Sequence, residues 1–257
     1  MSALLEVDGV QKVYGGLRAL DGVSFVAHES AITSVIGPNG AGKTTLFNCI
    51  AGAIRPSAGA IRLAGRNAAG LPAHRISRLG VARTFQNLAL FGGLTILENL
   101  MVGAYGEGRT GLLQGAFLSR RARAERREAE GEARRALSFV GLDGAAARLP
   151  GELPYGGQKR AEFARALMQR ARLLLLDEPM AGMGSAEKGE MSDLIRRVRD
   201  ERGLTVLIVE HDIPVVMSLS DRIVVLDFGR KIADGSPYEV RNNDAVIAAY
   251  LGQDSAA

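Results

Sequence analysis

Nine consecutive residues near the N-terminus have the types and spacing of a phosphate-binding loop. They fit the pattern G-x-x-x-x-G-K-[ST] and read Gly37-Pro38-Asn39-Gly40-Ala41-Gly42-Lys43-Thr44-Thr45. Glycines allow backbone N–H groups to curl around phosphate oxygens, and the N-terminus of a following helix adds partial positive charge. Lys43 can reach the β- and γ-phosphates, and Thr44 can ligate Mg²⁺. The segment therefore predicts a binding site for a nucleoside triphosphate.

Two adjacent carboxylates follow a run of leucines at residues 173–176. Asp177 and Glu178 then stand at the C-terminal end of a predicted buried strand, where open parallel sheets bind their ligands. Adjacent residues of a strand point to opposite faces, so the two acids can have different tasks. We expect Asp177 to hold Mg²⁺ through water, and Glu178 to orient and deprotonate the attacking water.

Two further polar residues follow predicted strands. His211, the middle residue of a Glu-His-Asp tripeptide, comes shortly after a predicted strand at residues 204–209. An isolated histidine is more often structural, but at a strand end of a nucleotide-binding sheet it can contact the γ-phosphate. Gln86 follows a predicted strand at residues 80–85 and could contact Mg²⁺ or water.

Hydrophobic patterns predict the elements that position these residues. Apolar runs predict strands, and longer amphipathic segments predict helices. The strands are expected at residues 31–36, 60–63, 80–85, 173–176, 204–209 and 223–226, and the helices at 44–51, 187–201 and 213–220. Residues 3–28 predict short strands with turns at Gly15-Gly16 and Asp21-Gly22. Because strands that alternate with helices form covered parallel sheets, we expect an α/β core with a mostly parallel sheet.

The middle of the chain predicts an insertion of helices into this core. One predicted helix covers residues 119–140. Its apolar face contains Ala122, Ala129, Ala133, Ala136 and Val140. The rest of the segment is rich in arginine and glutamate, which favours a solvated helix with ion pairs three and four residues apart. A nucleic-acid-binding arm is less favoured, because the glutamates cancel most of the positive field.

Composition excludes several function classes. The chain has 257 residues, of which 47% are hydrophobic and 5% aromatic, with no Trp and a formal net charge of +4. So few aromatic residues give little material for a surface that stacks single-stranded bases. Cys49 is the single cysteine and cannot form an internal disulfide, which favours a reducing compartment. The longest apolar run, residues 245–251, is too short to span a bilayer, and the N-terminus lacks the pattern of a secretory signal.

The order of these motifs resembles the nucleotide-binding subunit of ABC transporters over about residues 4–252. The most specific element resembles the family's signature motif and reads Leu153-Pro154-Tyr155-Gly156-Gly157-Gln158. The resemblance implies one P-loop NTPase domain with an N-terminal antiparallel β subdomain. It also implies a helical subdomain inserted at about residues 88–170 and a frayed tail at residues 253–257. The implied activity is ATP hydrolysis, with ATP and Mg²⁺ as cofactors.

Finer features resemble the ATP-binding subunits of branched-chain amino acid importers. They lie at residues 82–86, 94–100, 210–223 and 249–252. This resemblance implies a peripheral subunit on the cytoplasmic face of the inner membrane. The implied partners are a second ATP-binding subunit, two membrane permease subunits and, indirectly, a solute-binding protein, with no nucleic acid.

The resemblance also implies roles for matched positions. Tyr14 would stack on adenine, and Gln86 would sense the γ-phosphate and report to a membrane subunit. Residues 87–93, with an exposed Phe91, would form part of the docking groove for that subunit. The signature motif would close over ATP bound to the other ATPase subunit, so that two subunits would sandwich two nucleotides.

Three positions depart from the pattern of the family. Pro154 stands where serine is usual, Gly157 where glutamine is common, and Gly184 where aspartate or asparagine is usual. Proline has no hydroxyl to offer the γ-phosphate, although it suits the first turn of a helix. We therefore expect two unequal ATP sites. The site that uses this chain's catalytic residues would be fully active, and the site completed by its signature motif would be weaker.

Other interpretations stay open. Importers of urea, short amides or other amino acids would have a similar subunit, because the solute does not touch this chain. A soluble ABC-type ATPase that acts on nucleic acid or ribosomes usually has two modules or a long coiled coil, and this chain has one module. A GTPase would need an Asn-Lys-x-Asp motif, and the sequence contains no Asn-Lys pair. A nucleotide sensor without turnover would have no need of Glu178.

Overall fold

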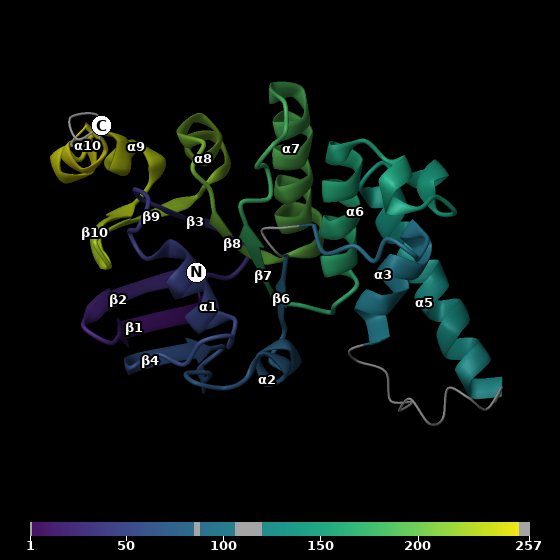
Figure 1. The fold of residues 1–257 in the computed structure, drawn as a ribbon, viewed down its shortest axis with the longest axis horizontal. Helices are drawn as coiled ribbons and strands as arrows, with labels where there is room; N and C mark the ends of the chain where they lie inside the picture. The colour runs from purple at the N-terminus through teal and green to yellow at the C-terminus, as the bar shows by residue number, and fades with distance from the viewer. Residues whose placement is uncertain (1, 85–87, 106–119, 252–257) are drawn as a thin grey trace.

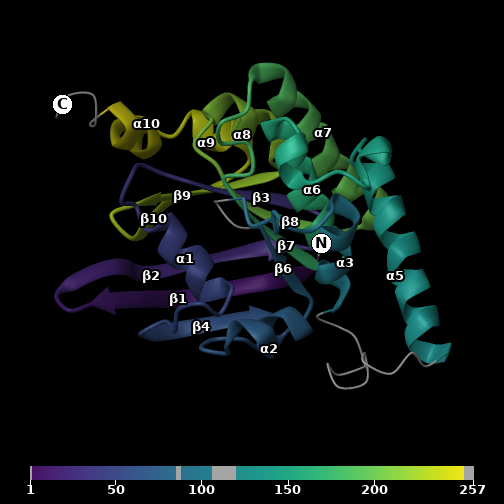
Figure 2. The same cartoon turned by 45° about the vertical axis from the view of Figure 1, so that its right-hand side comes forward.

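The structure, a computed structural model, describes residues 2–84, 88–105 and 120–251. It has two β-sheets, with one helix between them and further helices on the far side of the larger sheet (Figure 1). Figure 2 shows helix α1 between the two sheets. The α/β class predicted from the sequence is therefore confirmed.

The N-terminal sheet is antiparallel, with the strand order β2-β1-β4-β5. Its strands are β1 (Ala3–Tyr14), β2 (Leu17–His28), β4 (Ala58–Leu63) and β5 (Arg66–Asn67). Val23, Phe25 and Ala27 of β2 are buried, while the residues between them are half-buried. This alternation is typical of a sheet with one face on the core. The buried face packs on α1.

The predicted turn at Asp21-Gly22 is wrong, because β2 continues through these residues. Val10 pairs with Val23 and Lys12 with Leu20, so β2 has one more residue than β1 between the two pairs. The extra residue forms a bulge, and the positive φ of Gly22 (78°) accommodates it. A Gly-containing dipeptide has the same local signature in a turn and in a bulge.

The larger sheet has the strand order β10-β9-β3-β8-β7-β6 and is parallel except for the β9–β10 pair. Its strands are β3 (Ile32–Ile36), β6 (Val81–Arg83), β7 (Leu173–Asp177), β8 (Thr205–Val209), β9 (Arg222–Asp227) and β10 (Arg230–Gly235). Every residue of β3, β7 and β8 is buried, as in a sheet covered on both faces. The predicted mostly parallel sheet is therefore confirmed.

The parallel sheet carries a separate core on each face. Leu175 of β7 lies in the core that contains Phe47 of α1, whereas its neighbour Leu174 lies in the core that contains Phe163 of α6. A third, smaller core joins β9 to α8, α9 and α10. The helices are α1 (Lys43–Ile50), α2 (Ala73–Arg78), α3 (Ile96–Tyr105), α5 (Arg120–Phe139), α6 (Tyr155–Leu167), α7 (Ser185–Arg202), α8 (Ile213–Leu219), α9 (Pro237–Arg241) and α10 (Asp244–Leu251).

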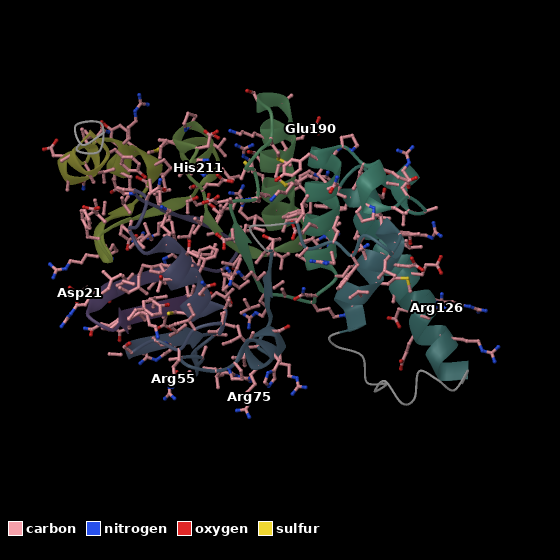
Figure 3. All side chains as sticks on the ribbon, in the orientation of Figure 1. Asp21, Arg55, Arg75, Arg126, Glu190 and His211 are labelled. Carbon is pink, nitrogen blue, oxygen red and sulfur yellow. The ribbon has the colours of Figure 1, made fainter. Side chains whose placement is uncertain are left out.

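The helices in the middle of the chain, α3, α5 and α6, pack together on one side of the molecule (Figure 1). The predicted helix is confirmed as α5, and Ala133, Ala136 and Val140 of its predicted apolar face are buried. Figure 3 shows Arg126 on the outer side of α5, as the expected solvated face requires. Within the described ranges, no helix combines the length and the hydrophobicity needed to cross a bilayer.

We predict that Phe163→Ala lowers the free energy of unfolding by about 3–5 kcal/mol, because it removes a large buried side chain from the helical core. Phe228→Ala is the matched control: Phe228 is 85% exposed, whereas Phe163 is 2% exposed. The control should change stability by less than about 0.5 kcal/mol. Urea unfolding measures the free energy of unfolding of both variants. Equal losses in Phe163→Ala and Phe228→Ala would contradict the two-core packing.

Candidate active site

The loop between β3 and α1 has a backbone path that needs glycine. Gly37, Gly40 and Gly42 have φ angles of 151°, 82° and 99°. Gly42 caps α1 without a side-chain hydrogen bond, and the first turn of α1 contains no acidic residue. This helix end is therefore arranged to bind an anion through its N–H groups. Pro38, Asn39 and Ala41 complete the loop, and Lys43, Thr44 and Thr45 begin the helix.

Close packing also requires two of these glycines. A Cβ atom at Gly37 would lie 2.1 Å from the carbonyl oxygen of Leu226 in β9. A Cβ atom at Gly42 would lie 2.5 Å from the carbonyl oxygen of Ala19 in β2. Both sheets therefore fix the path of the loop.

The ammonium group of Lys43 is hydrogen-bonded to the backbone at the start of this loop. Lys43 Nζ donates to the carbonyl oxygens of Gly37 at 2.6 Å and Pro38 at 2.8 Å. Burial lowers the pKa of Lys43, and the negative charge of Glu178 opposes that shift. The lysine is thus half-buried within the field of the Glu178 carboxylate, although the two belong to distant parts of the sequence.

Asp177 ends β7 with a buried side chain that bonds to an arginine. Arg83 Nη2 of β6 lies 2.9 Å from Asp177 Oδ2, and Arg83 Nη1 donates to Asn48 Oδ1 of α1 at 2.7 Å. The guanidinium group therefore joins the strand end to the helix that begins in the phosphate loop. The sequence gives no sign of this role of Arg83, since no local pattern connects residues 94 positions apart.

Glu178 turns away from the strand that ends at Asp177. Its φ of 48° is unusual for a residue other than glycine, and its backbone N–H donates to Val209 O at 2.9 Å. Glu178 Oε1 lies 4.0 Å from Nδ1 of His211, whose side chain is 62% exposed. Figure 3 labels His211 beside α8. The structure thus brings the two residues together at the ends of β7 and β8.

A second glutamate, Glu210, whose role no sequence pattern predicts, lies behind this pair. Glu210 is 1% exposed, and its carboxylate accepts hydrogen bonds from the backbone N–H groups of Met180 and His211. Burial raises the pKa of Glu210, while these hydrogen bonds oppose the shift. Asp212, two residues after Glu210, caps α8 by accepting from the Val215 N–H.

The signature residues lie at the start of α6. Pro154 is the N-cap residue and has extended ψ (156°), and no side chain caps this helix end. Leu153 is buried in the helical core, and Tyr155 is 43% exposed. Gln158 Nε2 donates to Leu153 O at 3.0 Å and so tightens the turn that enters the helix.

Small residues bring the signature close to the segment that follows Glu178. Gly156 and Gly157 are buried, and a Cβ atom at Gly156 would lie 2.2 Å from Glu187 Oε1 in α7. Glu187 also accepts from the backbone N–H of Gly184, the N-cap residue of α7, at 3.0 Å. The structure does not bring the signature to the phosphate loop, because α6 and α1 pack on opposite faces of the parallel sheet.

Of the two remaining predicted residues, the structure describes Tyr14 but not Gln86. Tyr14 is exposed at the end of β1, and Lys12 Nζ lies 4.8 Å from the centre of its ring. Lys12 pairs with Leu20, whose side chain lies against Gly42, so this hairpin end is near the phosphate loop. Gln86 lies outside the described residues, and its predicted contacts stay a prediction.

A phosphate loop, a carboxylate pair at a strand end and a separate helical region define a cassette ATPase of the P-loop class. The sequence family described as ABC transporter matches residues 20–181 of this chain. The chain therefore belongs to the family of ABC transporter ATP-binding proteins. A second family, described as branched-chain amino acid ATP-binding cassette transporter, matches residues 230–256.

Two relatives illustrate the similarity. The chain is 47% identical over 250 residues to the high-affinity branched-chain amino acid transport ATP-binding protein BraF of Pseudomonas aeruginosa, covering 97% of this chain and 98% of BraF. It is 42% identical over 250 residues to the protein LivG of Escherichia coli, which has the same description, with the same coverage.

Solved structures are also similar. The ADP conformation of the ATP-binding cassette MJ1267 has a TM-score of 0.86 and 29% identity, covering 98% of this chain and 100% of that chain. A structure described as the dimeric bacterial ABC transporter cassette MJ0796 has a TM-score of 0.77 and 26% identity, covering 91% and 98%.

We predict that Gly42→Ala abolishes tight nucleotide binding, because its Cβ would collide with Ala19 O and distort the start of α1. Gly16→Ala is the control, since Gly16 has ordinary φ and open space around its Cβ position. Titration with a fluorescent ATP analogue measures both variants. Wild-type affinity in Gly42→Ala would contradict this account of the loop.

Proposed function

We propose that this chain is the ATP-hydrolysing subunit of a membrane importer for branched-chain amino acids. The observation that carries the proposal is the grouping of Lys43, Glu178 and His211 at the carboxyl ends of three adjacent parallel strands, β3, β7 and β8. The names of the relatives, which align along nearly the whole chain, support the choice of solute. The match at residues 230–256 supports it independently of the core motifs.

In the proposed mechanism, water attacks the γ-phosphate of ATP in line with the leaving group. Lys43 and the N–H groups of the loop would neutralise charge on the phosphate oxygens. Glu178 would accept the proton of the attacking water, and His211 would contact the γ-phosphate from the next strand end. Tyr14 would stack on adenine beside the loop, and Gln86 would contact the γ-phosphate or the metal.

The donor set of Thr44, Asp177 and Gln86 fits Mg²⁺, which prefers oxygen ligands and keeps several waters. Thr44 is exposed in the first turn of α1, and Asp177 ends β7, which β8 separates from β3. Within the residues that the structure describes, no cluster of three or more His, Cys, Asp or Glu could hold a metal alone. This agrees with a site that phosphate oxygens complete. The ion would neutralise charge that develops on the phosphates.

The signature motif would act on ATP held by a second ATPase subunit. The uncapped start of α6, with its N–H groups, offers a second anion-binding helix end. Because the parallel sheet lies between it and this chain's own loop, it would reach a nucleotide on a partner subunit. The dimeric structure of the similar cassette MJ0796 supports such an arrangement.

Two membrane permease subunits would receive the conformational change that accompanies ATP hydrolysis. This chain would lie on the cytoplasmic face of the membrane. The segment after Gln86 is tied to the helical region: Arg165 Nη1 of α6 donates to Ala89 O at 2.5 Å, and Asn99 Oδ1 of α3 accepts from Phe91 N–H at 2.7 Å. Phe91 itself is 52% exposed, as a docking residue would be. Residues 4–252 would form one cassette, with 88–170 as its helical subdomain.

We predict that Glu178→Gln retains ATP binding but lowers turnover by about 10²–10⁴-fold, because an amide cannot accept the proton of the attacking water. ATPase assays and leucine uptake by the assembled importer measure the loss, and a fluorescent ATP analogue measures binding. Glu190→Gln is the control with unchanged turnover: Glu190 of α7 is 59% exposed and pairs with Arg160 of α6 (Figure 3). Undiminished hydrolysis in Glu178→Gln would assign the base to another residue.

We also propose that the ATP site completed by this chain's signature is the weaker one, because Pro154 offers no hydroxyl to the γ-phosphate. Pro154→Ser should raise hydrolysis at that site by about tenfold, the effect of one hydrogen bond to a charged group. Serine is a favourable N-cap residue, so the helix should persist. The measurement uses the complex with a distinct partner ATPase and Glu178→Gln in this chain, which leaves only that site active. An unchanged rate would contradict the proposal.

A further inference from the structure

Glu210 occupies an unusual position between two loops of the active site. It follows the last residue of β8, and its side chain is almost fully buried. Its Oε1 accepts from Met180 N–H at 2.9 Å, and its Oε2 accepts from His211 N–H at 3.2 Å. One carboxylate therefore holds the backbone of the loop after Glu178 and the backbone of the loop after β8.

The hydrogen bonds of Glu210 lie just beyond the last paired residues of β7 and β8. The last paired residues of β7 and β8 are Asp177 and Val209, and Glu178 N–H adds one more bond to Val209 O. In the part of the chain that the structure describes, the pairing of β7 with β8 ends there and does not extend to Glu178 and His211. Beyond the paired strands, the side chain of Glu210 joins the two segments by its hydrogen bonds to Met180 and His211.

From this geometry we infer that Glu210 is a positioning residue that sets the 4.0 Å separation between Glu178 and His211. The inference rests on the proposed function, in which these two residues handle the attacking water and the γ-phosphate. Glu210 itself would touch neither water nor nucleotide. It would act through the backbone of Met180 and His211, and its Oε2 also lies 4.0 Å from Nδ1 of the His211 ring.

The chemistry of the two bonds explains why a carboxylate is required. A carboxylate offers two acceptor oxygens, and both backbone groups are donors. Glutamine offers one oxygen and one NH₂ group, so one of the two backbone N–H groups would face another donor. A buried charge is costly, and an apolar side chain would fill the same volume at lower cost. The site therefore favours glutamate for the bonds that it makes.

Another anchor of the same loop uses different hydrogen bonds from those of Glu210, and the charge of Glu210 also acts on its lysine, Lys188. Asp212 caps α8 and forms an ion pair with Lys188 of α7. This pair would keep α8 in place when Glu210 is changed. Substitution of Glu210 should therefore alter the relative position of Glu178 and His211 without unfolding the region.

The test is a double-mutant cycle in the assembled complex, with Glu210→Gln, His211→Ala and both together. We expect Glu210→Gln to lower kcat by about tenfold or more, with KM for ATP changed by less than about threefold. In the His211→Ala background the same change should cost less than about threefold, because one of the two groups whose separation Glu210 sets is already absent. Glu201→Gln, an exposed glutamate on α7, should leave kcat unchanged.

Two results would overturn the inference. The first is a wild-type kcat in Glu210→Gln. The second is an equal fold-loss of kcat when Glu210→Gln is made in the wild type and in His211→Ala, which a purely structural residue would give. If the variant does not fold, hydrogen exchange on the unmodified protein decides. The amides of Met180 and His211 should then be protected although they lie outside strands, and fast exchange would contradict the inference. Absence of hydrolysis in the wild-type complex would instead refute the proposed function.

Discussion

The structure depends on one constraint: parallel strands end at the same edge of a sheet. β3 ends in the phosphate loop, β7 in Asp177 and Glu178, and β8 in the segment with His211. Because these strands are adjacent and fully buried, their ends are rigid, and polar groups there are held at fixed separations. The cation of Lys43 and the carboxylate of Glu178 thus lie close enough for their opposite charges to interact.

The same sheet also separates two regions. One face packs on α1 and the antiparallel sheet, and the other packs on α6, which begins in the signature motif, together with α3, α5 and α7. A residue on one face cannot reach a ligand on the other, which is why the proposed function assigns the signature to a partner's nucleotide. The segment Gly182–Gly184 links the regions, since Gly184 caps α7 and Glu187 of α7 lies against Gly156. The segment that follows Glu178 is therefore in direct contact with the start of α6.

Much of this arrangement could be predicted from the sequence, because its signals are local. The phosphate loop has fixed spacing, and buried strands such as Leu173–Asp177 are short apolar runs. The failures also have physical causes. Asp21-Gly22 is a bulge, since cross-strand pairing and not the dipeptide decides between bulge and turn. The short helices α2 and α9 were missed because one or two turns give too little periodicity, and buried packing stabilises them instead.

By itself the sequence determined the chemistry available at each strand end: a glycine loop with Lys43, an acid pair at Asp177 and Glu178, and a histidine at position 211. Only the tertiary structure decided which groups support them. Arg83 reaches Asp177 across 94 positions, and Glu210 reaches Met180 across 30. The physical reason is that hydrogen bonds between distant residues depend on which strands become neighbours. That order arises when the whole core packs, and no local pattern encodes it.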